Sequence, residues 1–506
     1  MTTQPNDIGH RVATGALWML LTKIAARSLG IVSMIVLARL LTPGDFGLVA
    51  IAMSFYALMA LISQFGFDTV LIQMREVDRS HYDTAWSLNL AFGVLSSIVI
   101  ASAAPYLAAY FDDPRLSEII HVTGFMFIIS GAQNVGVVDF RKKLQFDKEF
   151  YFSTVPRCIS FFVTLVLSFW LRNYWALVWG MVTMRVSSTL LSFVMSPYRP
   201  RLTFTAYSEL FNFSKWLMFK NMITFLDVRA PDLIVGKLIS PVATGLLSVA
   251  KELPMNAVMD VVATLNRATY PGYSLISDDM DRLRALYLKV LASVSIYTLP
   301  MSIGMIYLAD PLIPTFLGQQ WLACIPLVQF ATVASMISTL NSNTFYIFLA
   351  LGNPRLPTII FAVRVVVLLP AVAILTHFYG LLGAALSLII ASVAGSIPTA
   401  VVMRRRIGIT WSMLIEIHKR PAISTATMCI AMHVVELCFP TLTSRHPITA
   451  LAVLTATGAA TFVTTILLLW WLNGFPDGPE AKVTSEVRGL WQRLLAAGGR
   501  RPDVSA

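Results

Sequence analysis

The chain has 506 residues, of which 56% are hydrophobic and only 13% are charged. Soluble domains carry about a quarter charged residues, so this composition excludes a soluble enzyme or binding domain and predicts an integral membrane protein. The net charge of +11 would suit a nucleic-acid-binding protein, but the basic residues lie in short loops between apolar segments. That distribution is typical of loops that face anionic lipid, so no nucleic-acid partner is expected.

Fourteen segments of the chain are long and apolar enough to cross a bilayer, which requires about 20 mostly apolar residues per helix. We therefore expect an all-α polytopic membrane protein with about 14 transmembrane helices. The first and seventh segments are the least apolar because they contain several charged residues. In chain order the predicted spans are 14–39, 46–70, 84–110, 117–138, 152–171, 174–196, 214–238, 242–265, 285–309, 322–350, 356–376, 380–403, 421–439 and 447–472.

The loops on one side of this predicted membrane protein contain most of the basic residues. By the positive-inside rule these loops face the cytoplasm, which places both termini there as well. The polar segment 473–506 is then a cytoplasmic tail, and 487–495 within it has the pattern of a short helix on the inner membrane surface. The basic loops contain Arg75, Arg79, Arg141, Lys142, Lys143, Lys148, Arg199, Arg201, Arg282, Arg284, Lys289, Arg355, Arg404, Arg405, Arg406, Lys419 and Arg420.

Two stretches 198 positions apart resemble each other. Residues 36–52 read VLARLLTPGDFGLVAIA, and residues 234–250 read IVGKLISPVATGLLSVA. The similarity predicts two duplicated halves of six spans each, which run in parallel about an axis along the membrane normal, a common transporter plan. The alternative is a chance similarity between two membrane hairpins. The matched positions include Arg39 with Lys237, Pro43 with Pro241, Gly47 with Gly245 and Ala52 with Ala250.

The duplication and the span count together predict four segments. Residues 1–205 form an N-terminal lobe with spans 1–6, and residues 206–410 form a C-terminal lobe with spans 7–12. Residues 411–472 contain spans 13 and 14, which lie outside the duplication. Residues 473–506 form the tail.

Enzyme signatures are mostly missing from the sequence: it contains no P-loop, HExxH or GxSxG motif. The segment 279–281, Asp-Met-Asp, resembles the DxD metal motif of some glycosyltransferases, but it lies in a short charged loop, and a solvated loop is the favoured interpretation. The four cysteines are scattered through apolar segments without a CxxC motif, so we expect small core residues. We therefore expect no enzyme, no cofactor and no bound metal.

Ionisable residues inside the predicted spans are the most informative about function. Each costs about 2.5–3.5 kcal/mol at the centre of a bilayer, so each should face a polar cavity or a partner. Basic residues predominate, and a cavity lined by them would bind an anion such as a phosphate. The alternatives are snorkelling from helix ends and structural ion pairs. The candidate substrate-binding residues are Lys23, Arg27, Lys220, Lys251, Arg364, Arg185 and Arg229.

Several other charged residues are expected to have structural roles. Arg39, Lys215, Lys237 and Arg157 lie near the predicted interfaces and are expected to snorkel or to form pairs, and Arg229 with Asp232 has the i, i+3 spacing of an ion pair. The acidic residues in or near spans are candidates for proton or Na⁺ coupling, although paired or helix-end roles are favoured. These residues are Asp68, Asp227, Asp232, Asp260 and Glu436.

Aromatic residues near the predicted openings offer a second kind of contact, because they could stack on sugar rings. The favoured alternative is an interfacial aromatic belt. The residues concerned are Trp18, Trp216, Phe219 and Tyr270.

Three motifs near the beginning of the chain carry a family resemblance. They are GALW at 15–18, ARLLTPGDFGL at 38–48 and QFGFDTVLIQ at 64–73. Together they resemble the opening of the polysaccharide transporter family, which contains the Wzx-type oligosaccharide flippases of the multidrug/oligosaccharidyl-lipid/polysaccharide exporter superfamily. The resemblance is strong over residues 10–75 and weaker over 210–260, and elsewhere it rests on the span count and the loop spacing.

The resemblance implies two six-helix lobes that form a V-shaped cleft, two extra C-terminal helices and alternating access. It implies a bacterial inner-membrane protein that flips sugar repeat units linked to undecaprenyl pyrophosphate for exopolysaccharide, capsule or O-antigen synthesis. Membrane lipids, a polysaccharide polymerase and chain-length proteins are the implied partners. Cationic residues of related flippases are similar in position to Lys23, Arg27, Lys220 and Lys251. Phe67-Asp68 stands where small residues are more usual, so no single essential residue is transferred to this chain.

Two other functions remain open from the sequence. A small-molecule exporter of the same superfamily, coupled to H⁺ or Na⁺, would have twelve spans and an acidic cleft. A membrane polysaccharide polymerase or lipid-dependent glycosyltransferase would commonly have a large outer loop. Fourteen spans, short loops and a cationic bias favour the oligosaccharide flippase.

Overall fold

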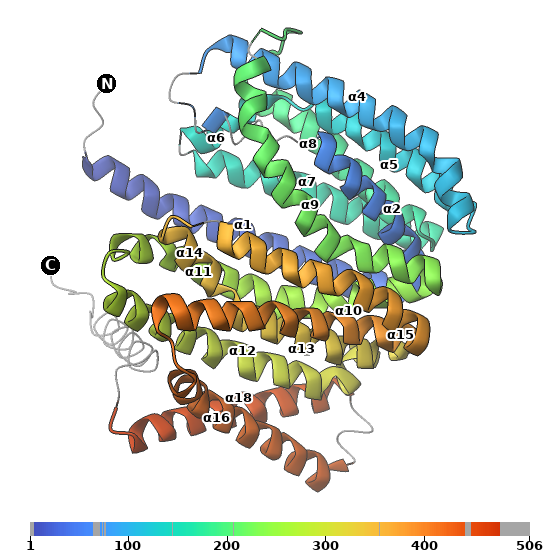
Figure 1. The fold of residues 1–506 in the computed structure, drawn as a ribbon. Coiled ribbons are helices and arrows are strands. Elements are labelled where there is room, and N and C mark those ends of the chain that lie inside the picture. The colour runs from blue at the N-terminus through green and yellow to red at the C-terminus, as the bar shows by residue number, and fades with distance from the viewer. Residues whose placement is uncertain are drawn as a thin grey trace, which may run out of the picture. The chain divides into compact units, whose positions relative to one another are not determined.

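The computed structural model describes residues 5–63, 71–72, 74, 77–143, 145–205, 207–353, 355–440 and 447–475. Every regular element within these ranges is a helix (Figure 1), which confirms the expected all-α class. The α-helices are α1 (Pro5–Leu40), α2 (Pro43–Ser63), α4 (Arg79–Tyr110), α5 (Arg115–Gly131), α6 (Val138–Lys142), α7 (Phe146–Leu171), α8 (Trp175–Met195), α9 (Tyr207–Leu238), α10 (Pro241–Pro254), α11 (Asp260–Leu275), α12 (Met280–Phe316), α13 (Ile325–Asn341), α14 (Asn343–Ala350), α15 (Arg355–Ile407), α16 (Trp411–Cys438) and α18 (Pro447–Leu472). Short 3₁₀ turns cover Val135–Val137 and Gln319–Cys324.

Each of the fourteen predicted spans falls on helical structure, although 46–70 extends past the end of α2. In the described part of the chain, ten helices are long and apolar enough to cross a membrane, and α5 with the bent segment that follows it would be an eleventh. Helix α15 counts once but contains two predicted spans, which meet at Gly380. The backbone angles of Gly380, φ 59° and ψ −141°, are readily adopted only by glycine. The protein is therefore a multi-pass membrane protein.

The seventh and eighth predicted spans fall on α9 and on the α10–α11 pair. Between α10 and α11 the chain forms one π-helical turn, Met255–Met259. This turn follows Pro254, which has no N–H to continue the α-helical hydrogen bonds. The Tyr297 hydroxyl donates to the carbonyl oxygen of Ala257 in the π turn at 2.7 Å. The eighth predicted span is thus a helix with a built-in irregularity rather than a continuous rod.

Helices α2 and α10 begin with the same kind of cap. The Thr42 hydroxyl accepts a bond from the Asp45 N–H at 3.3 Å, while an Asp45 carboxylate oxygen accepts from the Thr42 N–H at 2.9 Å. At the start of α10 the Ser240 hydroxyl accepts a bond from the Ala243 N–H at 3.2 Å. Each helix also has a proline at its first position, where a missing N–H costs nothing. These caps explain why both turns of the sequence repeat are short.

The chain divides into two compact units. Unit 1 contains Met1–Ala250, Phe316–Leu327 and Val365–Ser387, and unit 2 contains Lys251–Thr315, Val328–Arg364 and Leu388–Ala506. Both copies of the sequence repeat therefore lie in unit 1. The predicted lobes 1–205 and 206–410 remain a prediction.

The two units have separate apolar cores. Within unit 1, α4 packs along α5, α7 along α8 and α2 against α9 (Figure 1), around buried side chains such as Leu41, Ile51 and Phe127. Within unit 2, α11 packs on α14 and α16 on α18, and Tyr273 and Phe348 are completely buried. Cys324 is buried and Cys158 and Cys429 are half-buried, but Cys438 is exposed, so the expectation of a core cysteine is wrong at Cys438.

Candidate functional site

The first two candidate anion-binding residues lie one turn apart on α1, as their spacing predicts. Lys23 is exposed and Arg27 is half-buried. Arg27 makes no hydrogen bond or ion pair with the described residues, so its guanidinium donors remain available. In the same helix Trp18 packs on Phe150 of α7, with ring centroids 5.0 Å apart. The aromatic residue expected near the opening thus makes a helix-packing contact.

Arg364 on α15 has hydroxyl partners. Its Nη1 donates to Ser338 Oγ at 2.5 Å and to Ser392 Oγ at 3.2 Å, and the two serine oxygens are 3.1 Å apart. A Cβ on Gly395 would lie 3.3 Å from the Arg364 Cβ, so the two limbs of α15 pack closely here. The hydroxyls are neutral, so these contacts orient the guanidinium without cancelling its charge.

Arg185 and Arg229 have different surroundings from each other. The Arg185 guanidinium lies 5.9 Å from the centroid of the Tyr56 ring, which stacks on Phe127. Arg229 is half-buried and makes no ion pair with Asp232, although both residues are described. The expected pair is therefore wrong. Asp232 is only 1% exposed, whereas Arg229 is half-buried.

The remaining candidates are less well defined. Lys251 is half-buried on α10, four residues before the π turn, and Asp227 is half-buried on α9. Lys220 falls on α9, but its side chain lies outside the described residues, as do those of Lys215, Trp216 and Phe219. Asp68 lies outside the described residues altogether.

The two aspartates of the DxD-like segment form ion pairs. Asp279 pairs with Arg282 at 3.2 Å, and Asp281 pairs with Arg284 at 3.1 Å. Both pairs are partly exposed and have i, i+3 spacing, which is common at the start of a helix. Because α12 begins at Met280, the segment is the charged start of a helix and the expected loop is wrong for Asp281.

The basic residues at the two copies of the repeat bind helix ends, which the sequence did not reveal. Arg39 Nε donates to the carbonyl oxygen of Phe316, the last residue of α12, at 3.0 Å. Lys237 Nζ donates to the carbonyl oxygen of Tyr110, the last residue of α4, and lies 3.0 Å from the Asp112 carboxylate. The carbonyls at a helix C-terminus have no intrahelical partner and carry partial negative charge, so both side chains act as caps.

The two copies also touch each other through their glycines. A Cβ on Gly47 would lie 1.6 Å from the Pro241 carbonyl oxygen, and a Cβ on Gly245 would lie 1.9 Å from the Pro43 carbonyl oxygen. These two contacts are equivalent under the 198-residue register. Helices α2 and α10 therefore cross with their backbones in contact, which only glycine permits at both positions. The sequence analysis did not predict this contact, although the matched glycines of the repeat are a signal that could have found it.

The end of α1 is capped by side chains far away in the sequence. Gln320 Nε2 donates to the carbonyl oxygens of Ala38 and Leu41 at 2.5 and 2.9 Å, and Trp321 Nε1 donates to that of Ala38 at 2.8 Å. Trp321 is completely buried, with its ring edge-on to Phe46. Sequence reasoning missed these residues because the 3₁₀ turn that holds them lies outside the repeat.

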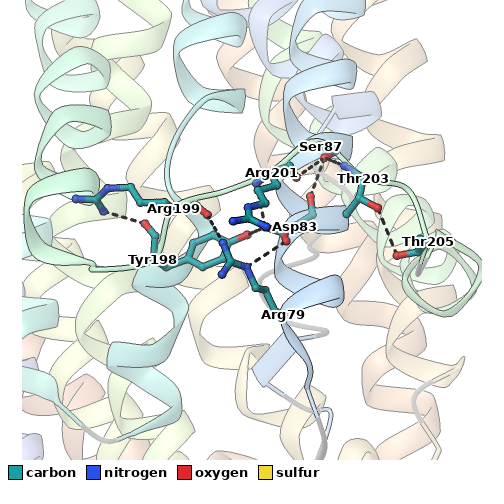
Figure 2. Close-up of polar contacts among 8 residues, drawn as sticks. All are labelled: Arg79, Asp83, Ser87, Tyr198, Arg199, Arg201, Thr203 and Thr205. Atoms are coloured by element: carbon teal, nitrogen blue, oxygen red, sulfur yellow. Dashed lines mark hydrogen bonds and ion pairs between the residues drawn. The ribbon is translucent and has the colours of Figure 1, made fainter.

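The connection between the predicted halves, residues 196–205, is fixed to the start of α4 (Figure 2). The buried Asp83 carboxylate accepts from the Tyr198 hydroxyl and from the Arg201 N–H at 3.0 Å, and it pairs with Arg79 at 3.5 Å. One turn later on α4, Ser87 accepts from the Thr203 N–H at 2.9 Å. Burial and the bond to the carboxylate both raise the pKa of Tyr198. The loop is thus held mainly by its backbone and by Tyr198, apart from the orienting role predicted for its basic residues.

This arrangement of helices defines a class of multi-pass, all-α membrane fold. The fold is similar to that of the lipid II flippase MurJ in an inward closed conformation, with a TM-score of 0.72, 14% identity, and 89% of this chain and 99% of that chain covered. It is also similar to an inward-facing multidrug resistance MATE family transporter, with a TM-score of 0.56, 15% identity, and 76% and 94% covered.

The family model described as polysaccharide biosynthesis protein matches residues 36–326, so the chain belongs to this family. The match confirms the resemblance to the polysaccharide transporter family. Curated relatives include the lipopolysaccharide biosynthesis protein WzxC of Escherichia coli (strain K12), 23% identical over 78% of this chain and 82% of that protein. The succinoglycan biosynthesis transport protein ExoT of Rhizobium meliloti (strain 1021) is 21% identical over 64% of this chain and 66% of that protein.

Proposed function

We propose that the protein carries an oligosaccharide repeat unit, linked to a polyprenyl pyrophosphate, across the bacterial inner membrane for exopolysaccharide, capsule or O-antigen synthesis. Membership of a polysaccharide biosynthesis family supports this function. The names of the relatives, which include a succinoglycan transport protein, point in the same direction. A lipid-linked substrate fits a multi-pass protein because the prenyl chain can remain in the bilayer while the sugars cross.

The proposed cycle is alternating access between the lobes 1–205 and 206–410. Residues 411–472 add two helices outside the duplication, and both termini lie in the cytoplasm. Reporter fusions test this topology. Fusions after Arg115 and after Gln320 should report the outside, and a fusion after Lys148 should report the inside. An inside result at Gln320 would contradict both the topology and the parallel duplication.

One observation carries the substrate assignment: Arg27 is a half-buried guanidinium on α1 without a partner among the described residues. Such a charge is tolerated inside a membrane protein only beside water or an anion. A guanidinium binds phosphate oxygens through its planar set of donors. We assign Arg27 and Lys23 to the diphosphate group, and Lys220, Lys251, Arg364, Arg185 and Arg229 to the same cationic path.

The membrane potential would supply a driving force. A diphosphate diester carries about two negative charges. Moving these charges out of the negatively charged cell interior releases about 4.6 kcal/mol per 100 mV of membrane potential. Transport would then proceed without ATP hydrolysis. Collapse of the potential with an ionophore should therefore slow export, whereas collapse of the pH gradient alone should have less effect. The opposite result would favour a proton-coupled exporter.

Substitution of the α1 cations tests the proposal. Arg27→Ala and Lys23→Ala should reach the membrane normally but lower polysaccharide export about ten-fold or more, since a hydrogen bond to a charged group is lost. Arg27→Lys should lose less because the charge remains. Arg157→Ala removes an exposed span arginine that we expect to snorkel, and it serves as the matched control. Normal export in both alanine variants at matched abundance would refute the anion site.

A further inference from the structure

We propose that the connection 196–205 binds an anionic phospholipid of the inner leaflet. In this site two arginines contact the lipid phosphate, and the exposed apolar side chains beside them lie among the acyl chains. The site is contained in unit 1. The general attraction of basic loops for anionic lipid depends on charge alone, whereas the backbone of this connection is also held in a fixed position against α4.

Main-chain atoms of the connection make most of its bonds to α4 (Figure 2). The Arg201 N–H donates to the Asp83 carboxylate at 3.0 Å, and the Thr203 N–H donates to the Ser87 hydroxyl at 2.9 Å. The Arg201 side chain is exposed, and its guanidinium has no partner among the described residues. Arg199 Nη1 donates to two carbonyl oxygens of the connection itself, at 2.7 and 2.9 Å. Both guanidinium groups therefore have donors available for a ligand.

The connection lies at the level where α4 enters the membrane. The third predicted span begins at residue 84, and the sixth ends at residue 196, where the connection starts. Asp83 and Ser87 are one helical turn apart, about 6 Å along α4. The bonds to these two residues therefore hold the connection where the lipid head groups meet the acyl chains. By the distribution of basic loops this end faces the cytoplasm.

Apolar side chains of the connection are exposed next to its arginines. Leu202 is 71% exposed and Phe204 is 54% exposed. At the membrane surface, apolar side chains beside basic ones insert into the boundary between head groups and acyl chains. A free phosphate ion would leave both side chains in water. They therefore indicate a ligand that has acyl chains as well as a phosphate.

The charge of the connection suits the phosphate of such a lipid. The carboxylate bonded to the connection, that of the buried Asp83, already pairs with Arg79 at 3.5 Å and accepts from the Tyr198 hydroxyl. Arg199 and Arg201 thus keep their positive charge for an anion outside the protein. A guanidinium presents a planar set of donors that matches the oxygens of a phosphate group. The two arginines therefore favour an anionic head group over a zwitterionic one.

Titration of the purified full chain with short-chain phosphatidylglycerol in a nonionic detergent tests the site, with bound lipid counted by native mass spectrometry. Phosphatidylglycerol should bind more tightly than phosphatidylcholine with the same acyl chains. Arg201→Gln and Arg199→Gln should each weaken its binding about five-fold, as expected for one basic residue near an anionic surface. The double variant should weaken it by the product of the two factors. Binding of phosphatidylcholine should not change.

The matched control is the double variant Arg404→Gln, Arg405→Gln, which removes two exposed arginines from the end of α15, on the same predicted side. It should bind phosphatidylglycerol with the parent affinity. An equal loss in the two double variants would reduce the effect to net charge and overturn the site. If the double variant of the connection fails to accumulate, Arg201→Gln alone decides, because its side chain makes no bond within the described protein.

Competitors show which phosphate the arginines bind. Inorganic phosphate and a polyprenyl pyrophosphate should each displace phosphatidylglycerol only at a higher concentration than phosphatidylglycerol itself requires. Displacement by phosphate at a lower concentration would assign the arginines to a free anion, and displacement by the pyrophosphate would assign them to the transported lipid. Either result overturns the phospholipid site, as does equal binding of phosphatidylglycerol and phosphatidylcholine. The assay measures no export, so its result is independent of the defect expected for Arg27→Ala.

Discussion

The two copies of the repeat share a backbone contact but differ in how firmly they are held. In the first copy the end of α1 receives donors from Gln320 and from the completely buried Trp321. In the second copy Lys237 is held by the Tyr110 carbonyl and by Asp112, whose side chain is 82% exposed. The two copies thus share the crossing of the helices but differ in the contacts around it. The first copy is thus held in part by a buried donor, whereas the ion pair of the second copy is largely exposed.

The largest loss of stability is expected at Gly47 and Gly245, the glycines that the two copies share. Gly47→Ala and Gly245→Ala each place a Cβ less than 2 Å from a backbone oxygen of the other copy, so the helices must separate. We expect both variants to lose about 3 kcal/mol or more of stability and to accumulate poorly. Abundance and thermal unfolding in detergent would measure this.

Gly30→Ala is the control for this prediction, because a Cβ on Gly30 of α1 would meet nothing within 4 Å. Alanine is favoured over glycine in a helix by about 0.5–1 kcal/mol, so this variant should be neutral or slightly stabilised. Equal, normal stability of Gly47→Ala and Gly30→Ala would show that the backbone crossing is not tight in the membrane.

A second prediction concerns Asp45, which is replaced by the residue found at the equivalent position of the second copy. Asp45 accepts from the Tyr174 N–H at 2.9 Å and from the Thr42 N–H and hydroxyl, whereas the matching residue of the second copy is Ala243. Asp45→Ala should cost about 1–2 kcal/mol, as expected for the loss of a helix cap. The reverse change, Ala243→Asp, should gain little because Ala243 is buried. The unfolding midpoints of both variants would measure this difference in stability between the two positions.

A third prediction concerns the turn beside Lys237. Arg115 donates two bonds to the Asp113 carboxylate, at 3.0 and 2.7 Å, and holds the pKa of Asp113 below its usual value of 3.8. Because the pKa is lowered in the folded state, this contact stabilises the turn fully above about pH 4 and is lost as the pH falls through the folded pKa. The protection of the amides of residues 111–116 from hydrogen exchange, relative to the intrinsic rate at each pH, should fall below pH 4. Asp113→Asn should exchange faster at pH 7 and show less pH dependence.

Particular residues show how far the sequence could predict this molecule. Fourteen apolar segments indicated the helices because lipid requires the backbone to bond within each segment. The repeat indicated Gly47 and Gly245 because both were matched in register. The caps on α1 could not be predicted, since Trp321 and Ala38 are 283 positions apart and their contact depends on packing. The spacing of Arg229 and Asp232 predicted a pair, but spacing does not show that Asp232 is buried while Arg229 is only half-buried.

The smallest loss of stability is expected on substitution of Asp112, the exposed ion-pair partner of Lys237. Asp112 has φ 56°, a left-handed conformation that asparagine also tolerates, so Asp112→Asn removes the charge without straining the backbone. The loss should be about 0.2–1 kcal/mol, as for other exposed ion pairs. It should shrink in about 1 M salt, where the Debye length falls to about 3 Å. Because Lys237 keeps the Tyr110 carbonyl, Asp112→Asn should cost less stability than Lys237→Gln does. An equal loss in the two variants would show that the carboxylate, and not the helix end, provides the stability of this contact.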